Sequence, residues 1–227
     1  MNLFSRIVAK LTSREPTDGD HCVIQALKAL DRDATATAIA KLEEALDAGL
    51  RSYDEAEIRT ILGKAYKNVG RYEDAIAMHK AALEISPRYH KAWNNLGIAY
   101  LDSGDVEEAV RCFERSIGYE PTYAYAHASL GAAYIELGQP EAAVRALEKA
   151  IALTPSIAVA HGNLALAYAM TGRFEEARGT LRRAIGMGYG NWRHVSERIR
   201  NLQAFERMSA PVHRADGRMT ADRVVED

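Results

Sequence analysis

The feature that most constrains this chain is a five-residue pattern that recurs four times at a spacing of 34 residues. Each copy has leucine first, a small residue second and tyrosine fifth, and the copies begin at Leu62, Leu96, Leu130 and Leu164. A glycine follows each copy at the same spacing: Gly70, Gly104, Gly138 and Gly172. A period of this length is typical of stacked helical units, none of which buries its apolar face alone. The chain is therefore expected to be an all-α solenoid.

Each unit is expected to contain two antiparallel helices joined by a tight turn. Leu62 and Tyr66 lie four residues apart and share one stripe of a helix. Gly63 lies where a second helix must approach closely. Gly70 falls where the first helix should end, because glycine tolerates the left-handed conformation that stops a helix. Pro87 ends the second helix.

The unit that begins at residue 90 carries the fullest pattern: Trp93, Leu96, Gly97, Tyr100, Ala109, Phe113 and Pro121. This pattern resembles the signature of the tetratricopeptide repeat (TPR) family. The resemblance implies a right-handed α-solenoid of stacked antiparallel helix pairs, the TPR superhelix, closed by a C-terminal capping helix.

The period also predicts how the chain is divided. The expected parts are a basic amphipathic N-terminal segment (1–18), a degenerate first repeat (19–55), four TPR units (56–89, 90–123, 124–157 and 158–190), a capping helix (191–207) and a disordered tail (208–227). Three extra residues around Gly49 to Tyr53 break the spacing between the degenerate repeat and the first clear unit.

The N-terminal segment has two faces on a helical projection. One face holds Leu3, Phe4, Ile7, Val8 and Leu11, and the other holds Arg6, Lys10 and Arg14. Such a helix can lie on an anionic membrane through residues 1–14 or dock into a partner. The alternative is that it packs on the first repeat, because a short helix is marginal in water until it finds something to bury against.

Composition limits the function classes. The net charge is −2, which argues against a general nucleic-acid binder. Cys22 and Cys112 form neither a metal-binding spacing nor a disulfide framework, so we expect two small packing residues in a reducing compartment. No stretch is long and apolar enough to span a membrane, and Arg6 and Lys10 interrupt any secretory signal. The expected location is the cytoplasm.

Nothing in the sequence indicates an enzyme or a bound cofactor. There is no nucleophile–base pair, no phosphate-binding glycine loop and no metal motif. His127 and His161 share a column with Trp93, so both are predicted to pack between helices and not to bind metal. The predicted function is therefore binding and not catalysis.

In the resembling family, the first helices of the units line a concave groove. Projecting that arrangement gives these groove residues: Lys64, Lys91, Asn94, Asn95, Ile98, Tyr125, Ser129, Ala132, Ile135, Asn163, Leu166 and Met170. The groove is expected to be polar toward its N-terminal end and apolar toward its C-terminal end.

One column of this groove is chemically specific. Asn95, Ser129 and Asn163 each precede the recurring leucine. In O-GlcNAc transferases and kinesin light chains, asparagines of this column hold the backbone of an extended peptide, because an amide both donates and accepts. The alternative is that these are only tolerated surface residues. The chain also departs from the carboxylate clamp of chaperone-binding members, which needs Lys, Asn, Asn, Lys and Arg at positions that hold Thr60, Lys64, Asn95, Tyr125 and Ser129 here, so heat-shock chaperone tails are not expected as ligands.

Two functions follow from these features. The first is a protein interaction module, an adaptor or scaffold that binds an extended peptide or a helix of another protein in the groove. The second is a membrane-peripheral assembly factor addressed by the basic N-terminal helix. Self-association through an exposed apolar end at the weak first repeat is a further hypothesis.

Overall fold

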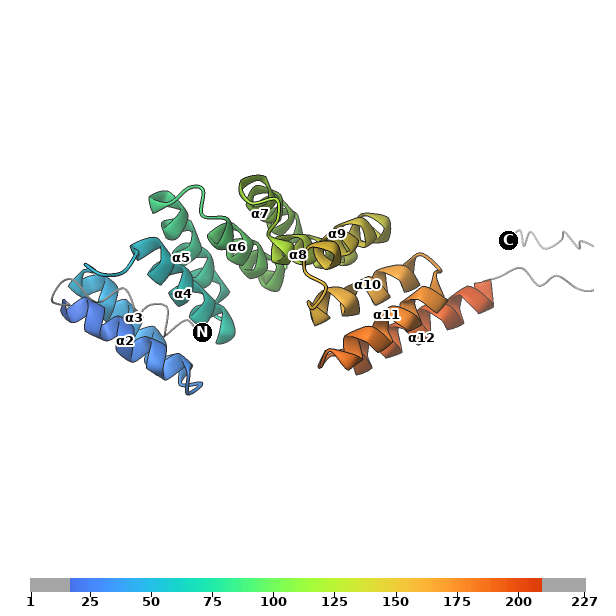
Figure 1. Cartoon of the computed structure of the whole chain (residues 1–227), viewed down its shortest axis with the longest axis horizontal. Coiled ribbons are helices and arrows are strands. Elements are labelled where there is room, and N and C mark those ends of the chain that lie inside the picture. Colours follow the sequence, from blue (N-terminus) through green and yellow to red (C-terminus); the bar gives the residue numbers. More distant parts are fainter. Residues whose placement is uncertain (1–16, 210–227) are drawn as a thin grey trace, which may run out of the picture.

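A computed structural model describes residues 17–209 of the 227-residue chain, and this part contains eleven helices and no strand (Figure 1). Most of the predicted N-terminal amphipathic segment and of the predicted disordered tail lies outside the described residues. The helices are α2 (Asp18–Leu30), α3 (Thr35–Ala48), α4 (Glu55–Asn68), α5 (Tyr72–Ile85), α6 (His90–Ser103), α7 (Val106–Tyr119), α8 (Ala124–Glu136), α9 (Pro140–Leu153), α10 (Ala158–Met170), α11 (Phe174–Gly186) and α12 (Trp192–Ser209).

The helices form consecutive pairs that stack on one another. α2 packs on α3, α4 on α5, α6 on α7, α8 on α9 and α10 on α11, and the second helix of a pair contacts the first helix of the next. α12 has no partner of its own within the described residues and packs on α10 and α11. The predicted all-α solenoid is confirmed.

The glycine of the recurring pattern is explained by the packing within a pair. A Cβ atom on Gly97 would lie 2.6 Å from Cε1 of Phe113, and one on Gly131 would lie 2.4 Å from Cγ of Leu147. Both distances are shorter than carbon atoms tolerate, so the two helices can approach only because this position has no side chain. The glycine eight residues after the pattern begins ends the first helix: Gly104 caps α6 with φ 96°.

The loop that contains the three extra residues before the first clear unit donates hydrogen bonds to the buried carboxylate of Asp20. The Asp20 carboxylate accepts hydrogen bonds from the backbone N–H groups of Thr17, Arg51 and Ser52, at 3.0 to 3.1 Å. Burial raises the pKa of this carboxyl, but these hydrogen bonds outweigh burial and lower it overall. The inserted loop is therefore tied to the start of α2 by an ionised side chain.

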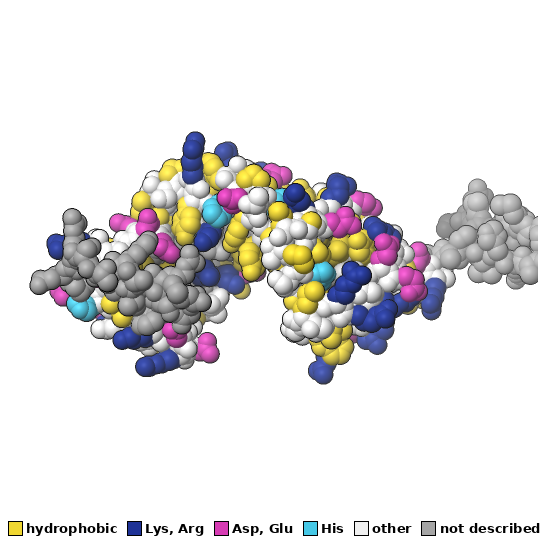
Figure 2. Space-filling model, viewed as in Figure 1, with side chains coloured by type: hydrophobic (Ala, Val, Ile, Leu, Met, Phe, Trp, Pro, Cys, Tyr) yellow, Lys and Arg dark blue, Asp and Glu magenta, His cyan; other side chains and the backbone are white. Residues whose placement is uncertain are grey.

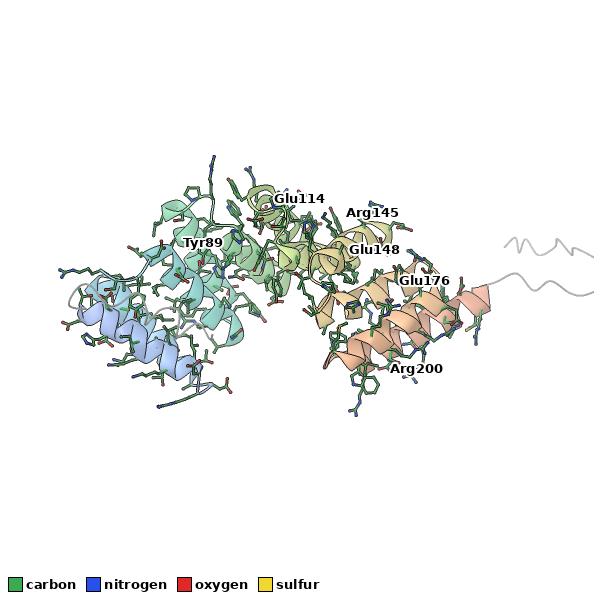
Figure 3. The ribbon with its side chains drawn as sticks, viewed as in Figure 1. Tyr89, Glu114, Arg145, Glu148, Glu176 and Arg200 are labelled. Atoms are coloured by element: carbon green, nitrogen blue, oxygen red, sulfur yellow. The ribbon has the colours of Figure 1, made fainter. Side chains whose placement is uncertain are left out.

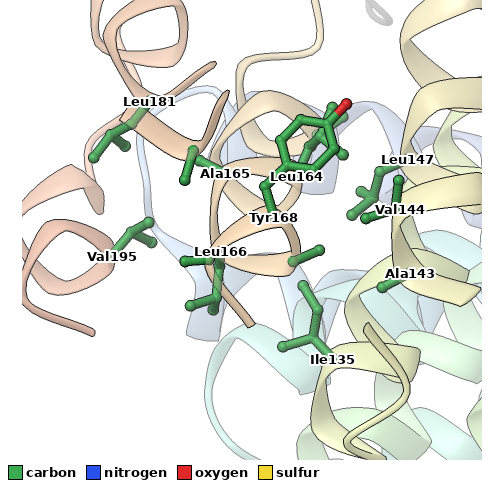
Figure 4. Packing of buried hydrophobic residues seen from close by; sticks show 14 of the residues in the cluster. Ile135, Ala143, Val144, Leu147, Leu164, Ala165, Leu166, Tyr168, Leu181 and Val195 are labelled. Carbon is green, nitrogen blue, oxygen red and sulfur yellow. The ribbon is translucent and has the colours of Figure 1, made fainter. Parts of the chain in front are cut away.

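The core runs along the whole array, and its largest cluster joins α8 to α12. In Figure 4, Leu147 of α9 faces Leu164 and Tyr168 of α10, while Leu181 of α11 and Val195 of α12 lie on the far side of α10. No pair has a closed core of its own, so each unit depends on its neighbours.

The stacking curves the array into an arch. The first helices of successive pairs also contact one another: α4 touches α6, α6 touches α8 and α8 touches α10. These four helices therefore lie on the inner side of the curve and are called the inner helices below, while α5, α7 and α9 lie outside them (Figure 1).

Candidate functional site

The inner helices carry the residues predicted to line the groove, and nine of the twelve retain accessible surface. The nine are exposed or half-buried: Lys64, Lys91, Asn95, Ile98, Tyr125, Ser129, Ala132, Asn163 and Met170. They come from all four inner helices, which contact one another in succession.

The predictions for Asn94, Ile135 and Leu166 were wrong, because these side chains are only 3%, 5% and 3% exposed. Asn94 shares a column with Thr60, and that column is buried between neighbouring inner helices. Ile135 and Leu166 belong to the core cluster that joins α8, α10 and α12 (Figure 4). α12 packs on α10 where the groove was expected to continue, and this packing takes Leu166 out of reach.

The accessible residues of the inner helices change character along the array. At the α4–α6 end it presents the exposed amines of Lys64 and Lys91. An ion pair joins these helices, with Nζ of Lys67 3.7 Å from Oδ2 of Asp102. At the α8–α10 end the exposed side chains are Tyr125 (55%) and Val159 (46%), so that end is apolar.

The amide column lies between these two ends. Asn95 on α6, Ser129 on α8 and Asn163 on α10 are half-buried. Within the described residues, no side-chain hydrogen bond of the protein engages any of the three. Their donors and acceptors are therefore available to a bound chain.

A run of aromatic rings lies at the N-terminal ends of α6 and α8. The His90 ring lies 6.4 Å from Tyr89 and 4.9 Å from Tyr123, and Tyr123 lies 5.7 Å from Tyr125. Burial, followed by the carboxylates of Glu57 and Asp54, raises the pKa of Tyr89 to about 12. Of this run only Tyr125 was predicted, as a groove residue, because Tyr89, His90 and Tyr123 lie at or next to the turns before α6 and α8, outside the recurring pattern. Figure 3 shows Tyr89 where α5 leads into α6.

The histidines in the tryptophan column have a structural role. Nε1 of Trp93 donates to the Pro87 carbonyl at 2.8 Å, and the Nε2 atoms of His127 and His161 lie 2.9 Å from the carbonyls of Pro121 and Pro155. Each ring thus closes its unit onto the preceding proline turn. No group of three or more His, Cys, Asp or Glu side chains in residues 17–208 could hold a metal ion.

His79 was not singled out from the sequence. It occupies the column of Phe113 and Leu147, faces Gly63 and is 1% exposed. Burial, with a smaller contribution from Lys64, lowers its pKa to about 4. The 34-residue spacing from Phe113 would have revealed a core histidine, since the two positions are equivalent.

The recurring tyrosines form two different environments. Tyr66 donates to Glu43, and Tyr168 donates to Glu148 at 2.8 Å. Arginines lie over these two rings at 4.3 and 4.1 Å from the centroid: Arg71 and Arg173. Tyr100 and Tyr134 have Asp105 and Gln139 in place of those arginines and are more exposed, and over Tyr100 the cation is Lys80, with Nζ 5.5 Å from the ring centroid. This arrangement was not predicted, because it depends on residues outside the pattern.

The two thiols are buried and unpaired with each other. Burial raises the pKa of Cys22 and raises that of Cys112 to about 12. Both thiols are therefore protonated at neutral pH, as expected of packing residues and not of nucleophiles.

Two shallow hollows repeat on the outer side of the array. One is lined by Trp93, Leu96 and Tyr100, and the other by the equivalent His127, Leu130 and Tyr134. Charged residues of α5, α7 and α9 surround them, among them Glu114 and Arg145 (Figure 3). They are a second candidate surface, less continuous than that of the inner helices. None of the helices from α2 to α12 is long and apolar enough to cross a bilayer.

Comparison with solved structures gives the same architecture. The chain is 26% identical to MamA over 75% of its length and 94% of that chain, with a TM-score of 0.60. It is 21% identical to TTC0263, a thermophilic TPR protein of Thermus thermophilus (82% and 99% coverage, TM-score 0.65). It is 19% identical to a chain of the Cut9–Hcn1 hetero-tetramer of the APC/C (81% and 36% coverage, TM-score 0.68). The last two likenesses concern the fold alone.

Sequence comparison places the family. No curated protein matches the chain. One family model described as tetratricopeptide repeat matches residues 25–90 and 129–191, and a second with the same description matches residues 69–133. Together these matches cover all the helix pairs except the first turns of α2. The chain belongs to the tetratricopeptide repeat family.

Proposed function

We propose that this protein is a cytoplasmic adaptor or scaffold that holds an extended segment of a partner protein along its inner helices. TPR repeats are generally non-catalytic interaction modules, and the solenoid presents a long continuous surface to a partner. The inner surface supports this role better than the outer one, because all four inner helices contribute to it.

The observation that carries the proposal is the amide column of Asn95, Ser129 and Asn163. Each side chain is half-buried, and none is engaged within the described part of the protein. An amide can accept from a peptide N–H and donate to a peptide carbonyl, so two asparagines can hold a backbone whatever its side chains are.

The spacing of the column suits an extended chain. Packed helices lie about 8–10 Å apart, so Asn95 and Asn163, two inner helices apart, are about 18 Å from each other. An extended peptide advances about 3.3–3.6 Å per residue, so five or six residues span that distance. One side-chain contact to the peptide backbone would then recur at about every third residue.

Selectivity would come from the two ends of the groove. Lys64 and Lys91 favour acidic residues in the partner segment, and Tyr125 and Val159 favour apolar ones. Heat-shock chaperone tails remain disfavoured as partners, because Thr60, at one of the clamp positions, is buried and bonds its own helix at the Ala56 carbonyl (2.8 Å).

Peptides selected from a random library against the full-length protein provide the test. The double substitution Asn95→Ala with Asn163→Ala should weaken binding of the selected peptide at least tenfold, because each lost hydrogen bond contributes about 1 kcal/mol. The folded state should survive, since both positions are half-buried.

The matched control is Glu84→Ala with Glu114→Ala, two exposed residues of the outer helices α5 and α7. The control should bind as the wild type does. Weakening by the outer pair and not by the inner pair would move the site to the outer hollows and contradict the proposal.

A further inference from the structure

The corner where α11 meets α12 exposes a group of large apolar side chains. Three large apolar side chains are exposed there: Ile185 (41%), Met187 (43%) and Trp192 (37%). Figure 2 shows yellow side chains flanked by dark blue ones at this corner, at the lower end of the C-terminal half. This group of three residues is called the apolar tip.

The apolar tip is held rigidly. The N–H of Met187 donates to the carbonyls of Arg183 and Ala184, and that of Gly188, with φ 81°, donates to Ile185. The next residue, Tyr189, turns inward and lies above Gly162, where a Cβ atom would be 2.4 Å from its ring. Because Tyr189 anchors the connection to α10, Met187 and Trp192 are fixed on the outside.

Arginines begin at the apolar tip and continue along α12, and the guanidinium of Arg193 lies 5.3 Å from the centroid of the Trp192 ring. Arg193, Arg200 and Arg207 recur at seven-residue spacing and are exposed, so they follow one side of α12 for about 21 Å. Arg182 of α11 joins them, because Arg178, one turn earlier, donates to Gln203 of α12 at 3.2 Å. No ion pair engages Arg182, Arg193, Arg200 or Arg207 within the described residues. Figure 3 shows Arg200 on the open side of α12.

The arginines of α11 are not a feature of the repeat, because the equivalent positions of the two preceding units hold other residue types. The column of Arg182 holds Glu114 and Glu148 in the two preceding units, and the column of Arg178 holds Val110 and Val144. The last unit thus departs from its neighbours toward positive charge at the place where the solenoid ends.

We propose that the α11–α12 corner docks on an anionic lipid surface, with the apolar tip entering the interface and the arginines contacting the headgroups. Tryptophan, methionine and isoleucine beside arginine are the residue types that suit a membrane interface. The surface is a projecting corner and not a concave groove, so it fits a flat partner. A nucleic acid could stack a base on Trp192 but would leave the aliphatic side chains of Ile185 and Met187 without an apolar partner. This proposal is independent of the partner bound by the inner helices.

Vesicle sedimentation tests whether the arginines bind anionic headgroups. The full-length protein should bind vesicles of phosphatidylcholine with phosphatidylglycerol, should not bind phosphatidylcholine alone, and should be released by high salt. Arg182→Gln with Arg193→Gln and Arg200→Gln should weaken binding at least tenfold, since each arginine near an anionic surface contributes about fivefold. The matched control is Arg88→Gln with Arg115→Gln and Arg145→Gln, three exposed arginines elsewhere, and it should retain binding.

Tryptophan fluorescence tests the apolar tip. The chain has two tryptophans, and Trp93→His removes the other one with a residue that His127 and His161 show to fit that column. In this variant Trp192 emission should shift to the blue on anionic vesicles. An unchanged spectrum, equal losses by the two arginine variants, or retention on polyglutamate without vesicle binding would each overturn the assignment, the last in favour of an acidic protein segment.

Discussion

The inner faces of α6 and α10 carry equivalent residues, but one of these residues is accessible and the other is buried. Ile98 of α6 and Leu166 of α10 are the same position of two units 68 residues apart. Ile98 keeps accessible surface in the groove, whereas Leu166 is 3% exposed. α6 has another helix pair on either side, but α10 is followed by α12, whose Val195 and Ile199 enter the same core cluster.

This difference shows that the packing of α12 buries part of the inner face of α10, whereas the equivalent position of α6 stays accessible. Partner selectivity should therefore depend on the first three inner helices more than on the last. The column position fixes where a side chain points, and the neighbouring helix decides whether a partner can reach it.

The largest expected effect comes from truncating the covered member of this pair. Leu166→Ala should lower the free energy of unfolding by about 2–5 kcal/mol, because it leaves a cavity under α12. Ile98→Ala should cost about half as much, since part of that side chain already contacts solvent. Urea unfolding of the two variants measures the contrast, and equal losses would show that α12 does not cover α10 in solution.

A second test uses the pH dependence of the free energy of unfolding, to which His79 of α5 should contribute. The pKa of His79 is about 4 in the folded protein and about 6.5 in an unfolded chain. A lowered histidine pKa means that the stability is present above pH 6.5 and is lost as the pH falls toward 4. At pH 5 the loss should be about 2 kcal/mol. His79→Phe, which places the Phe113 ring type under Gly63, should remove this loss, and urea unfolding at pH 7 and pH 5 measures it.

The control for that experiment is His194→Gln, at an exposed position of α12. It should follow the wild-type pH dependence. If His79→Phe also kept that dependence, another group would be responsible for the acid sensitivity.

The recurring tyrosines sharpen the comparison further. Tyr168→Phe should cost about 1 kcal/mol, because it removes the hydrogen bond to Glu148 and leaves that bond's acceptor without its donor. Tyr134→Phe should leave the free energy of unfolding almost unchanged. At the position that Arg173 occupies beside Tyr168, the unit of Tyr134 has Gln139. Thermal denaturation of both variants decides the matter, and similar shifts in Tm would mean that packing alone explains the column.

The smallest expected effect lies between α4 and α6. Lys67 and Asp102 are both partly exposed, so their ion pair should contribute less than about 1 kcal/mol. A double-mutant cycle with Lys67→Ala and Asp102→Ala measures the coupling. A larger coupling that persists in high salt would show that the open end of the groove is more rigid than its exposure implies.

Much of the fold could be predicted from the sequence. The helix ends near Gly104, the close approach at Gly97 and the packing role of His127 follow from the 34-residue columns, because each unit repeats the same local contacts. The groove was predicted less completely. Asn94 and Leu166 stand at the right positions of the right helices, but their exposure depends on neighbours that the family projection does not specify. Whether the accessible residues bind a partner stays a prediction.

By itself the sequence determined the repeat, the helix pairs and most of the core, because those depend on side chains within one unit and on a nearest neighbour of the same design. The tertiary structure decided what differs between units. It placed α12 over Leu166, set arginines over Tyr66 and Tyr168 and Lys80 over Tyr100, and left Ile185, Met187 and Trp192 exposed. These outcomes depend on contacts with a particular neighbouring helix, and no single column of the repeat specifies them.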